Sequence, residues 1–418
     1  MVEKTRPPWF WVAVLSIAVG LATLVSWGTT VWNERPLGTI HRHLEVKDFR
    51  RALSLANAYL DEFPDHSRAQ SLKAQALAGM ERWVEATELF EVSGAAEPDE
   101  VHIWATALLH QQQWKDALPL LQETLNHQPN NADALHEVTA CHMQLGNHEA
   151  ALATAERFQL QPNCGARGNL LIGTIHRNLN NNRSAVEAWR KVVELNPNAD
   201  DLQIPAEDFF AEFGMALMNI GEVSEATQNL NRSVIIRPRA TNYVELSDGY
   251  AQLGKVSEAE TALQKALALD ESNWQAREKL AELALRQEDT EQALQWLVPL
   301  FERPDLRSST AYLAQRTFTV AGDKHQASKW QTKTQQLRKR EQIIGTINHV
   351  LVEVPQSFWA QAIRAYRFAE AGNWPQAQAA VLPLMKDGAN EPFVKDLIEC
   401  IRTRGPLPSL DTLPIEQF

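Results

Sequence analysis

Residues 144–151 read QLGNHEAA and residues 252–259 read QLGKVSEA, so each stretch begins with Gln-Leu-Gly and has an alanine five residues after the glycine. Glycine readily adopts the left-handed backbone conformation that ends a helix, and alanine is the strongest helix former. Gly221 and Ala226 repeat the same spacing. Each stretch therefore predicts a turn between two helices.

The alanine of these stretches recurs through almost the whole chain, most often at intervals of 34 residues and elsewhere at 31, 33, 41 or 50. The recurring positions are Ala52, Ala86, Ala117, Ala151, Ala185, Ala226, Ala259, Ala293, Ala327 and Ala377. A fixed period of this length indicates stacked supersecondary units, each of which buries its apolar face against its neighbours.

Two further positions keep the same register. Twelve residues after the alanine, five units have a proline, which cannot continue a helix: Pro64, Pro98, Pro129, Pro197 and Pro238. Twelve residues before the alanine, most units have a small residue, among them Ala74, Ala105, Gly173, Gly214 and Ala281. Small groups at this position and at the recurring alanine allow two helices to approach closely. The register therefore predicts paired helices.

The chain resembles the tetratricopeptide repeat family in residues Gln144 to Ala151, in Ala185, Trp189 and Asn196-Pro197, and in Tyr250 to Gly254 with Ala259. The resemblance covers about residues 33–390. It implies an all-α solenoid of about ten helical hairpins in a right-handed superhelix, with a concave groove that holds a peptide or a partner protein.

The pattern divides the chain into eight segments. We expect a short basic tail at 1–8, a transmembrane helix at 9–32, repeats one to five at 33–198, an acidic inter-repeat loop at 199–206, repeats six to nine at 207–340, a long-helix extension and linker at 341–357, repeat ten at 358–390, and a C-terminal cap and tail at 391–418.

The stretch from Trp9 to Trp32 has no charged residue over 24 positions, which is long enough for a helix to cross a bilayer. Tryptophans at both ends, Trp9, Trp11, Trp27 and Trp32, suit the two membrane interfaces. A cleaved secretory signal is the alternative, but the apolar run is longer than usual for one and no small-residue cleavage site follows. We expect a single-pass protein of the plasma or inner membrane, with the repeats extracytoplasmic, in the periplasm.

The composition of the chain and its lack of known catalytic motifs argue against several classes of function. A net charge of −12 argues against generic nucleic-acid binding, and the chain contains no nucleotide-binding, metalloprotease or hydrolase motif. We expect no enzyme, no cofactor and no small-molecule substrate. His136, Cys141 and His142 lie on one predicted helix but point in different directions, so no metal site is expected. A bridge between Cys141 and Cys164 stays open.

Counting back from the alanines assigns groove-facing residues to the first helices of repeats three to five. They are His102, Thr106, His110, His136, Met143, Arg167, Thr174, Arg177 and Asn178. Arginines and histidines beside apolar residues suit a peptide with an acidic group and a hydrophobic anchor. The alternative is a solvated groove face. We expect Arg167 and Arg177 to hold the anionic group.

A second candidate surface lies in the stretch from Asp323 to about Leu351, which predicts one unusually long helix. Its cations are Lys324, Lys329, Lys333, Arg338, Lys339 and Arg340, with no acidic residue among them. This stretch predicts either a solvated helix face or a docking strip for anionic lipid or an acidic partner.

These observations favour a membrane-anchored, non-enzymatic adaptor that recruits protein or peptide partners or helps them assemble. The alternative is a permanent structural subunit of a larger membrane complex. Aromatic residues that the repeat pattern does not require would then anchor the interface: Trp114, Trp274, Trp296, Trp330, Trp359 and Trp374.

Overall fold

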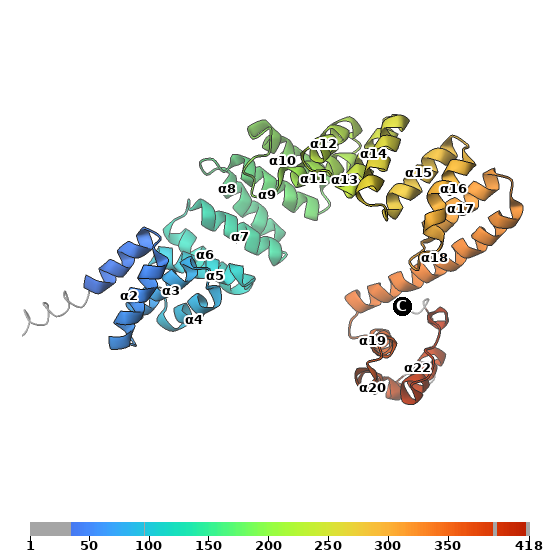
Figure 1. Ribbon diagram of the computed structural model, residues 1–418. Coiled ribbons are helices and arrows are strands. Elements are labelled where there is room, and N and C mark those ends of the chain that lie inside the picture. Colours follow the sequence, from blue (N-terminus) through green and yellow to red (C-terminus); the bar gives the residue numbers. More distant parts are fainter. Residues whose placement is uncertain (1–34, 96, 388–390, 415–418) are drawn as a thin grey trace, which may run out of the picture. The chain divides into compact units, whose positions relative to one another are not determined.

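The computed structural model describes residues 35–95, 97–387 and 391–414, and all regular structure in these ranges is helical (Figure 1). The chain forms two compact units, which meet between Ser233 and Val234 inside helix α12. Each unit is a succession of antiparallel helical pairs. The predicted all-α fold is therefore confirmed.

The first unit begins with helical residues 35–45. The helices that follow are α2 (Phe49–Glu62), α3 (Ser67–Gly79), α4 (Trp83–Ser93), α5 (Pro98–His110), α6 (Trp114–His127), α7 (Ala132–Gln144), α8 (His148–Gln159), α9 (Gly165–Asn178), α10 (Asn182–Leu195), α11 (Ala206–Asn219) and α12 (Val223–Ile236).

The second unit contains four further pairs and a C-terminal cap. Its elements are α13 (Ala240–Gln252), α14 (Val256–Leu269), α15 (Trp274–Arg286), α16 (Thr290–Phe301), α17 (Ser308–Val320), α18 (Lys324–Glu353), α19 (Phe358–Glu370), α20 (Trp374–Val381), α21 (Leu384–Asp387), α22 (Pro392–Thr403) and the 3-10 turn η1 (Leu410–Thr412).

The recurring alanines lie in the second helix of each pair. Each of them has no exposed surface except Ala327 in α18, which is partly buried. The turns before them have a left-handed residue, such as Gly146 with φ 74° and Gly254 with φ 73°. Asn180 has φ 57° at the equivalent place, so the turn also forms without glycine.

Close helix packing explains the small residue twelve positions before the alanine. A Cβ atom on Gly173 of α9 would lie 2.3 Å from Nε1 of Trp189 on α10. Trp189 is buried, and its Nε1 donates a hydrogen bond to the carbonyl oxygen of Leu170 at 3.2 Å. The indole therefore occupies the space that a side chain at position 173 would need.

Two interruptions of the repeat period have distinct structures. Ala199 and Leu202, in the loop before α11, are buried in the same core as Phe209 and Phe210. The loop therefore contributes to the packing between repeats. The second interruption is α18, a single helix of 30 residues.

The predicted transmembrane helix at 9–32, with Trp9, Trp11, Trp27 and Trp32, lies outside the described residues. Within the described ranges, no helix combines the length and the apolar character needed to cross a membrane. This finding contradicts the predicted single-pass topology, and with it the predicted plasma- or inner-membrane localisation with an extracytoplasmic repeat domain. We correct that prediction and assign the chain no localisation.

Candidate partner-binding surfaces

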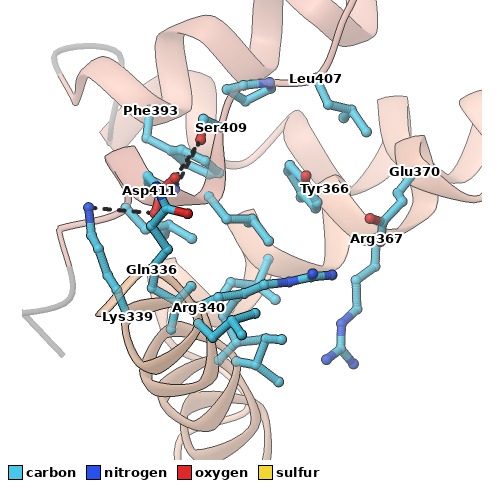
Figure 2. Close-up of a pocket in the computed structure, with 18 of the residues that line it drawn as sticks. Gln336, Lys339, Arg340, Tyr366, Arg367, Glu370, Phe393, Leu407, Ser409 and Asp411 are labelled. Atoms are coloured by element: carbon cyan, nitrogen blue, oxygen red, sulfur yellow. Dashed lines mark hydrogen bonds and ion pairs between the residues drawn. The ribbon is translucent and has the colours of Figure 1, made fainter. Parts of the chain in front are cut away.

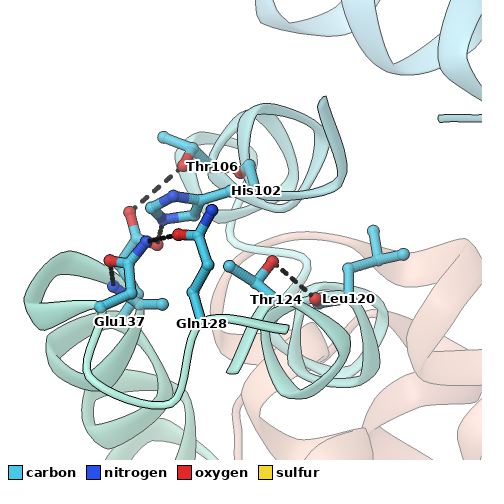
Figure 3. A network of polar contacts seen from close by, with 8 residues as sticks. His102, Thr106, Leu120, Thr124, Gln128 and Glu137 are labelled. Atoms are coloured by element: carbon cyan, nitrogen blue, oxygen red, sulfur yellow. Dashed lines mark hydrogen bonds and ion pairs between the residues drawn. The ribbon is translucent and has the colours of Figure 1, made fainter. Parts of the chain in front are cut away.

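The first candidate surface is the predicted groove of the first unit, where a carboxylate of one repeat binds side chains of the preceding one. Nε2 of His102 on α5 lies 2.7 Å from Oε2 of Glu137 on α7. Thr106 donates a hydrogen bond from Oγ1 to Oε1 of the same carboxylate at 3.2 Å (Figure 3). Two predicted groove residues are thus brought together by Glu137, which the sequence analysis did not select.

The surroundings of His102 raise the pKa of its imidazole. Burial on its own would lower the pKa of His102, but the hydrogen bond to Glu137 and the charge of that carboxylate outweigh burial, so the pKa is raised. His136 shows the opposite balance. Burial first, and then the positive charge of Arg167, lower the pKa of His136.

The two arginines that were expected to hold an anionic ligand have partners inside the protein. Nη1 of Arg177 on α9 lies 2.6 Å from Oε2 of Glu212 on α11, the first helix of the next repeat. The guanidinium of Arg167 lies 5.2 Å from the centre of the Phe158 ring. Arg177 is therefore already neutralised, and a role for either arginine in binding a partner stays a prediction.

The remaining predicted groove residues contact their own repeat or its neighbour. His110 stacks on Trp83 with ring centres 4.0 Å apart, and Thr174 donates to the carbonyl oxygen of Leu170 at 2.9 Å. Met143 packs against the buried cluster that contains Ile175, whereas Asn178 is exposed. These contacts leave the nine residues spread over α5, α7 and α9, and their binding role stays a prediction.

Polar pairs between adjacent first helices occur in both units. In the first unit, Arg68 on α3 donates to Glu100 on α5. In the second, Nζ of Lys279 on α15 lies 2.6 Å from Oδ1 of Asp248 on α13. We call these contacts, together with His102–Glu137 and Arg177–Glu212, the inter-repeat polar pairs. The repeat register of the alanines did not predict these pairs.

The three cysteines form no disulfide bond. Cys141, Cys164 and Cys400 are buried free thiols, so the bridge that the sequence left open between Cys141 and Cys164 is not formed. Burial raises the pKa of the Cys141 thiol to about 11. Among the described residues, no group of three histidine, cysteine or acidic side chains is placed to hold a metal ion.

The tryptophans expected at a subunit interface are partly buried and pack within the protein. Trp330 lies 4.2 Å from the Phe301 ring, and Arg307 lies 3.9 Å above the ring of Trp274. The others join hydrophobic clusters of their own repeats or contact a neighbouring ring: Trp114, Trp296, Trp359 and Trp374. Their side chains are therefore engaged in the fold.

The second candidate surface involves α18, whose six cations are all exposed. Lys333, Lys339 and Arg340 line a cavity, whereas Lys324 and Lys329 do not. The guanidinium of Arg338 lies 5.4 Å from the centre of the Tyr312 ring on α17. The role of these six cations as a docking strip stays a prediction.

This C-terminal cavity has a volume of about 910 Å³. Its walls are residues 333–347 of α18, helix α19, Phe393 of α22 and the returning segment 407–413 (Figure 2). The apolar part of the lining consists of Leu337, Ile343, Ile344, Ile347, Ile363, Phe393, Leu407, Pro408, Leu410 and Leu413. Polar side chains surround this apolar part, and the cavity is open to solvent.

Cations outnumber acids around the cavity. The lining contains four basic side chains, Lys333, Lys339, Arg340 and Arg367, and two acidic ones, Glu370 and Asp411. Nζ of Lys339 lies 3.5 Å from Oδ1 of Asp411, and Arg367 donates to Oδ1 of Asn348 at 3.0 Å. Burial, followed by the charges of Glu370 and Cys400, raises the pKa of Tyr366, which also lines the cavity.

Comparisons with known proteins agree with the repeat architecture. The family model for the Psidin N-terminal TPR repeats region matches residues 34–162, and two tetratricopeptide repeat models match residues 166–199 and 244–297. The auxiliary subunit NAA15 of the N-terminal acetyltransferase A complex of Arabidopsis thaliana is 23% identical over 254 residues. The match covers 58% of this chain and only 28% of that protein.

Solved structures of three repeat proteins match parts of this chain. The C-terminal part of a TPR repeat-containing protein from Cytophaga hutchinsonii is 15% identical, with a TM-score of 0.46 over 57% of this chain and 97% of its own. A tetratricopeptide repeat protein from Parabacteroides merdae is 17% identical, with a TM-score of 0.39 over 60% and 98%. YrrB, a TPR protein with an unusual peptide-binding site, is 20% identical, with a TM-score of 0.38 over 46% and 94%.

The helical pairs, the buried alanines, the left-handed turns and the three family matches describe the same unit. This chain is built of tetratricopeptide repeats.

Proposed function

We propose that this protein is a non-enzymatic scaffold that binds a protein partner through its repeats. Tetratricopeptide repeat proteins are protein-interaction scaffolds, and this chain carries such repeats through both units. The observation that carries the proposal is the open cavity beside α18, where basic side chains surround an apolar lining. A few convergent polar groups around an apolar concavity are typical of binding sites.

A second candidate is a permanent subunit of a larger complex. The similarity to an auxiliary subunit of an acetyltransferase complex supports it, although this chain corresponds to 28% of that subunit's length. In this case the partner would be a stable, stoichiometric component. The two candidates share the repeat surface and differ in the lifetime of the complex.

Purification under native conditions separates them. The tagged full chain is recovered from its source cells and passed over a size-exclusion column, and the proteins that elute with it are quantified. A scaffold that binds transiently is expected to elute mostly alone with substoichiometric partners, and a permanent subunit in a fixed ratio with others. Elution alone, with no partner recovered even after crosslinking, would contradict both candidates.

A further inference from the structure

We propose that the C-terminal cavity binds an acidic peptide segment of the partner, with a large apolar side chain of that segment seated on the apolar lining. The proposal rests on the scaffold function proposed above and assigns it one site and one class of ligand. It depends on the charge, the shape and the hydrogen-bonding groups of the cavity.

The charge argument concerns side chains that the fold leaves unpaired. Lys333 and Arg340 are exposed, line the cavity and make no ion pair with any residue in the described ranges. Figure 2 shows the Arg340 side chain extending from α18 toward the α19 side of the cavity, where Tyr366 and Arg367 lie. With four cations against two acids, this cavity attracts anions although the whole chain has a charge of −12.

The apolar argument concerns what lies between these charges. Ile343 and Ile347 of α18 and Phe393 of α22 are almost fully buried, and together they support the floor of the cavity. Ile344 also lines it but leaves 42% of its surface exposed. A volume of about 910 Å³ accommodates several side chains, and covering exposed aliphatic surface gives a favourable free energy of about 25 cal/mol per Å².

Groups that recognise a peptide are present beside the charges. The hydroxyl of Tyr366 lines the cavity and forms no hydrogen bond with a described residue. The opposite wall includes Leu407, Pro408 and Ser409, which belong to a non-helical segment before η1. Gln336 on α18 adds an amide. A carboxylate near Arg340 and an apolar side chain over Ile344 would therefore meet complementary groups at the same time.

The arrangement favours a peptide over a membrane surface. An anionic bilayer is bound best by cations on one outward face, whereas Lys333 and Arg340 line a concavity whose other walls come from α19 and the segment 407–413. Lys339 is paired with Asp411, on the segment that closes the cavity. The remaining free cations converge on a concave site, which suits a short acidic segment.

The test uses the full chain and a labelled peptide in which leucine or phenylalanine alternates with glutamate, measured by fluorescence anisotropy. The cavity variant is Lys333→Glu with Arg340→Glu. The matched control is Lys255→Glu with Lys324→Glu, which makes the same change of charge at two exposed lysines of the same unit that do not line the cavity. We expect the cavity variant to weaken binding about tenfold or more, because two charge-assisted contacts are lost, and the control to bind as the wild type does.

Three further measurements complete the test. Replacing the peptide's apolar residues by serine, and separately Ile344→Asp in the protein, should each weaken binding. Circular dichroism and thermal unfolding of each variant verify the fold, since the exchanged side chains are exposed. Vesicles containing phosphatidylserine provide the alternative ligand.

The proposal is overturned if the wild type does not bind the peptide, or if the cavity and control variants weaken binding equally. It is also overturned if vesicles, and not the peptide, show the cavity-specific loss. If native partners still elute with the cavity variant, the scaffold function must use another surface of the repeats, and only the assignment of this cavity is overturned. If no native partner elutes with either the wild type or the variants, the result contradicts the scaffold function and does not test the cavity.

Discussion

His102 and Glu137 are 35 residues apart in the chain, and their Nε2 and Oε2 atoms are 2.7 Å apart. The pair connects the first helix of one repeat to the first helix of the next. Because burial alone would lower the pKa of His102, the raised pKa shows that the carboxylate dominates the histidine's surroundings. The groove-facing side of the first helices, which was expected to bind a ligand, therefore also connects adjacent repeats.

The first prediction concerns pH. A raised pKa in the folded state means that the His102–Glu137 pair contributes most below the unfolded pKa of about 6.5, and that this contribution is lost as pH rises through the folded value. Glu137→Gln should therefore lower the free energy of unfolding more at about pH 5.5 than at about pH 8. The loss at the lower pH should be about 1.5–3 kcal/mol, typical of a hydrogen bond to a charged group. Urea unfolding at both pH values measures it.

His136 provides a control of opposite sign. Its lowered pKa means that protonation disfavours the folded state, so its penalty grows as pH falls through the unfolded value. His136→Gln should therefore reduce the loss of stability on acidification. An equal effect of Glu137→Gln at the two pH values would contradict the interpretation of the His102 pair.

The second prediction compares two helical glycines. Gly173→Ala should destabilise the protein by about 1–3 kcal/mol, because the new Cβ would meet Trp189 at 2.3 Å in a packed core. Gly345→Ala in α18 has no atom within 4 Å and should stabilise by about 0.5–1 kcal/mol through helix propensity. Thermal unfolding of the two variants should thus shift in opposite directions, and shifts in the same direction would refute the packing argument.

The third prediction concerns Arg177 and Glu212. Their side chains are 40% and 37% exposed, so their coupling should be about 1 kcal/mol or less despite the 2.6 Å separation. A double-mutant cycle with Arg177→Gln and Glu212→Gln measures this coupling. A larger value would mean that the pair is more shielded from solvent than its exposure indicates.

The fourth prediction concerns thiol reactivity. Cys141 is fully buried and its pKa is raised to about 11, so little thiolate exists near neutral pH. We expect Cys141 to react with maleimide far more slowly in the native protein than in denaturant, as judged by mass spectrometry. Rapid native labelling of Cys141 would show that α7 opens locally.

The repeat register was predictable because packing imposes it on every unit. Ala151 and Ala259 must be small where two helices cross, and Gly146 and Gly254 must turn the chain with positive φ. The same requirement acts at each repeat, so it leaves a periodic signal. The same register placed a small residue at Gly173, but it did not identify Trp189 as the side chain that packs against it.

The partners of individual side chains were not predictable in this way. Counting placed His102 and Arg177 on the first helices, but which carboxylate each one meets depends on the rotation between adjacent repeats and on rotamers. The C-terminal cavity requires the segment at 407–413 to return to α18, which no period specifies. Arg367 and Tyr366 therefore carried no signal as cavity residues.

Helix α18 belongs to two consecutive repeats, which are joined by the helix itself and not by a loop. Its first half pairs with α17, and Ile343, Ile347 and Val350 in its second half belong to the core of the last repeat. At 1.5 Å per residue its 30 residues extend about 45 Å. Elsewhere a short turn joins one repeat to the next, whereas here a change in the tilt of the final repeat would have to bend one continuous helix. The C-terminal cavity is therefore connected to α17 through one continuous helix and not through a turn.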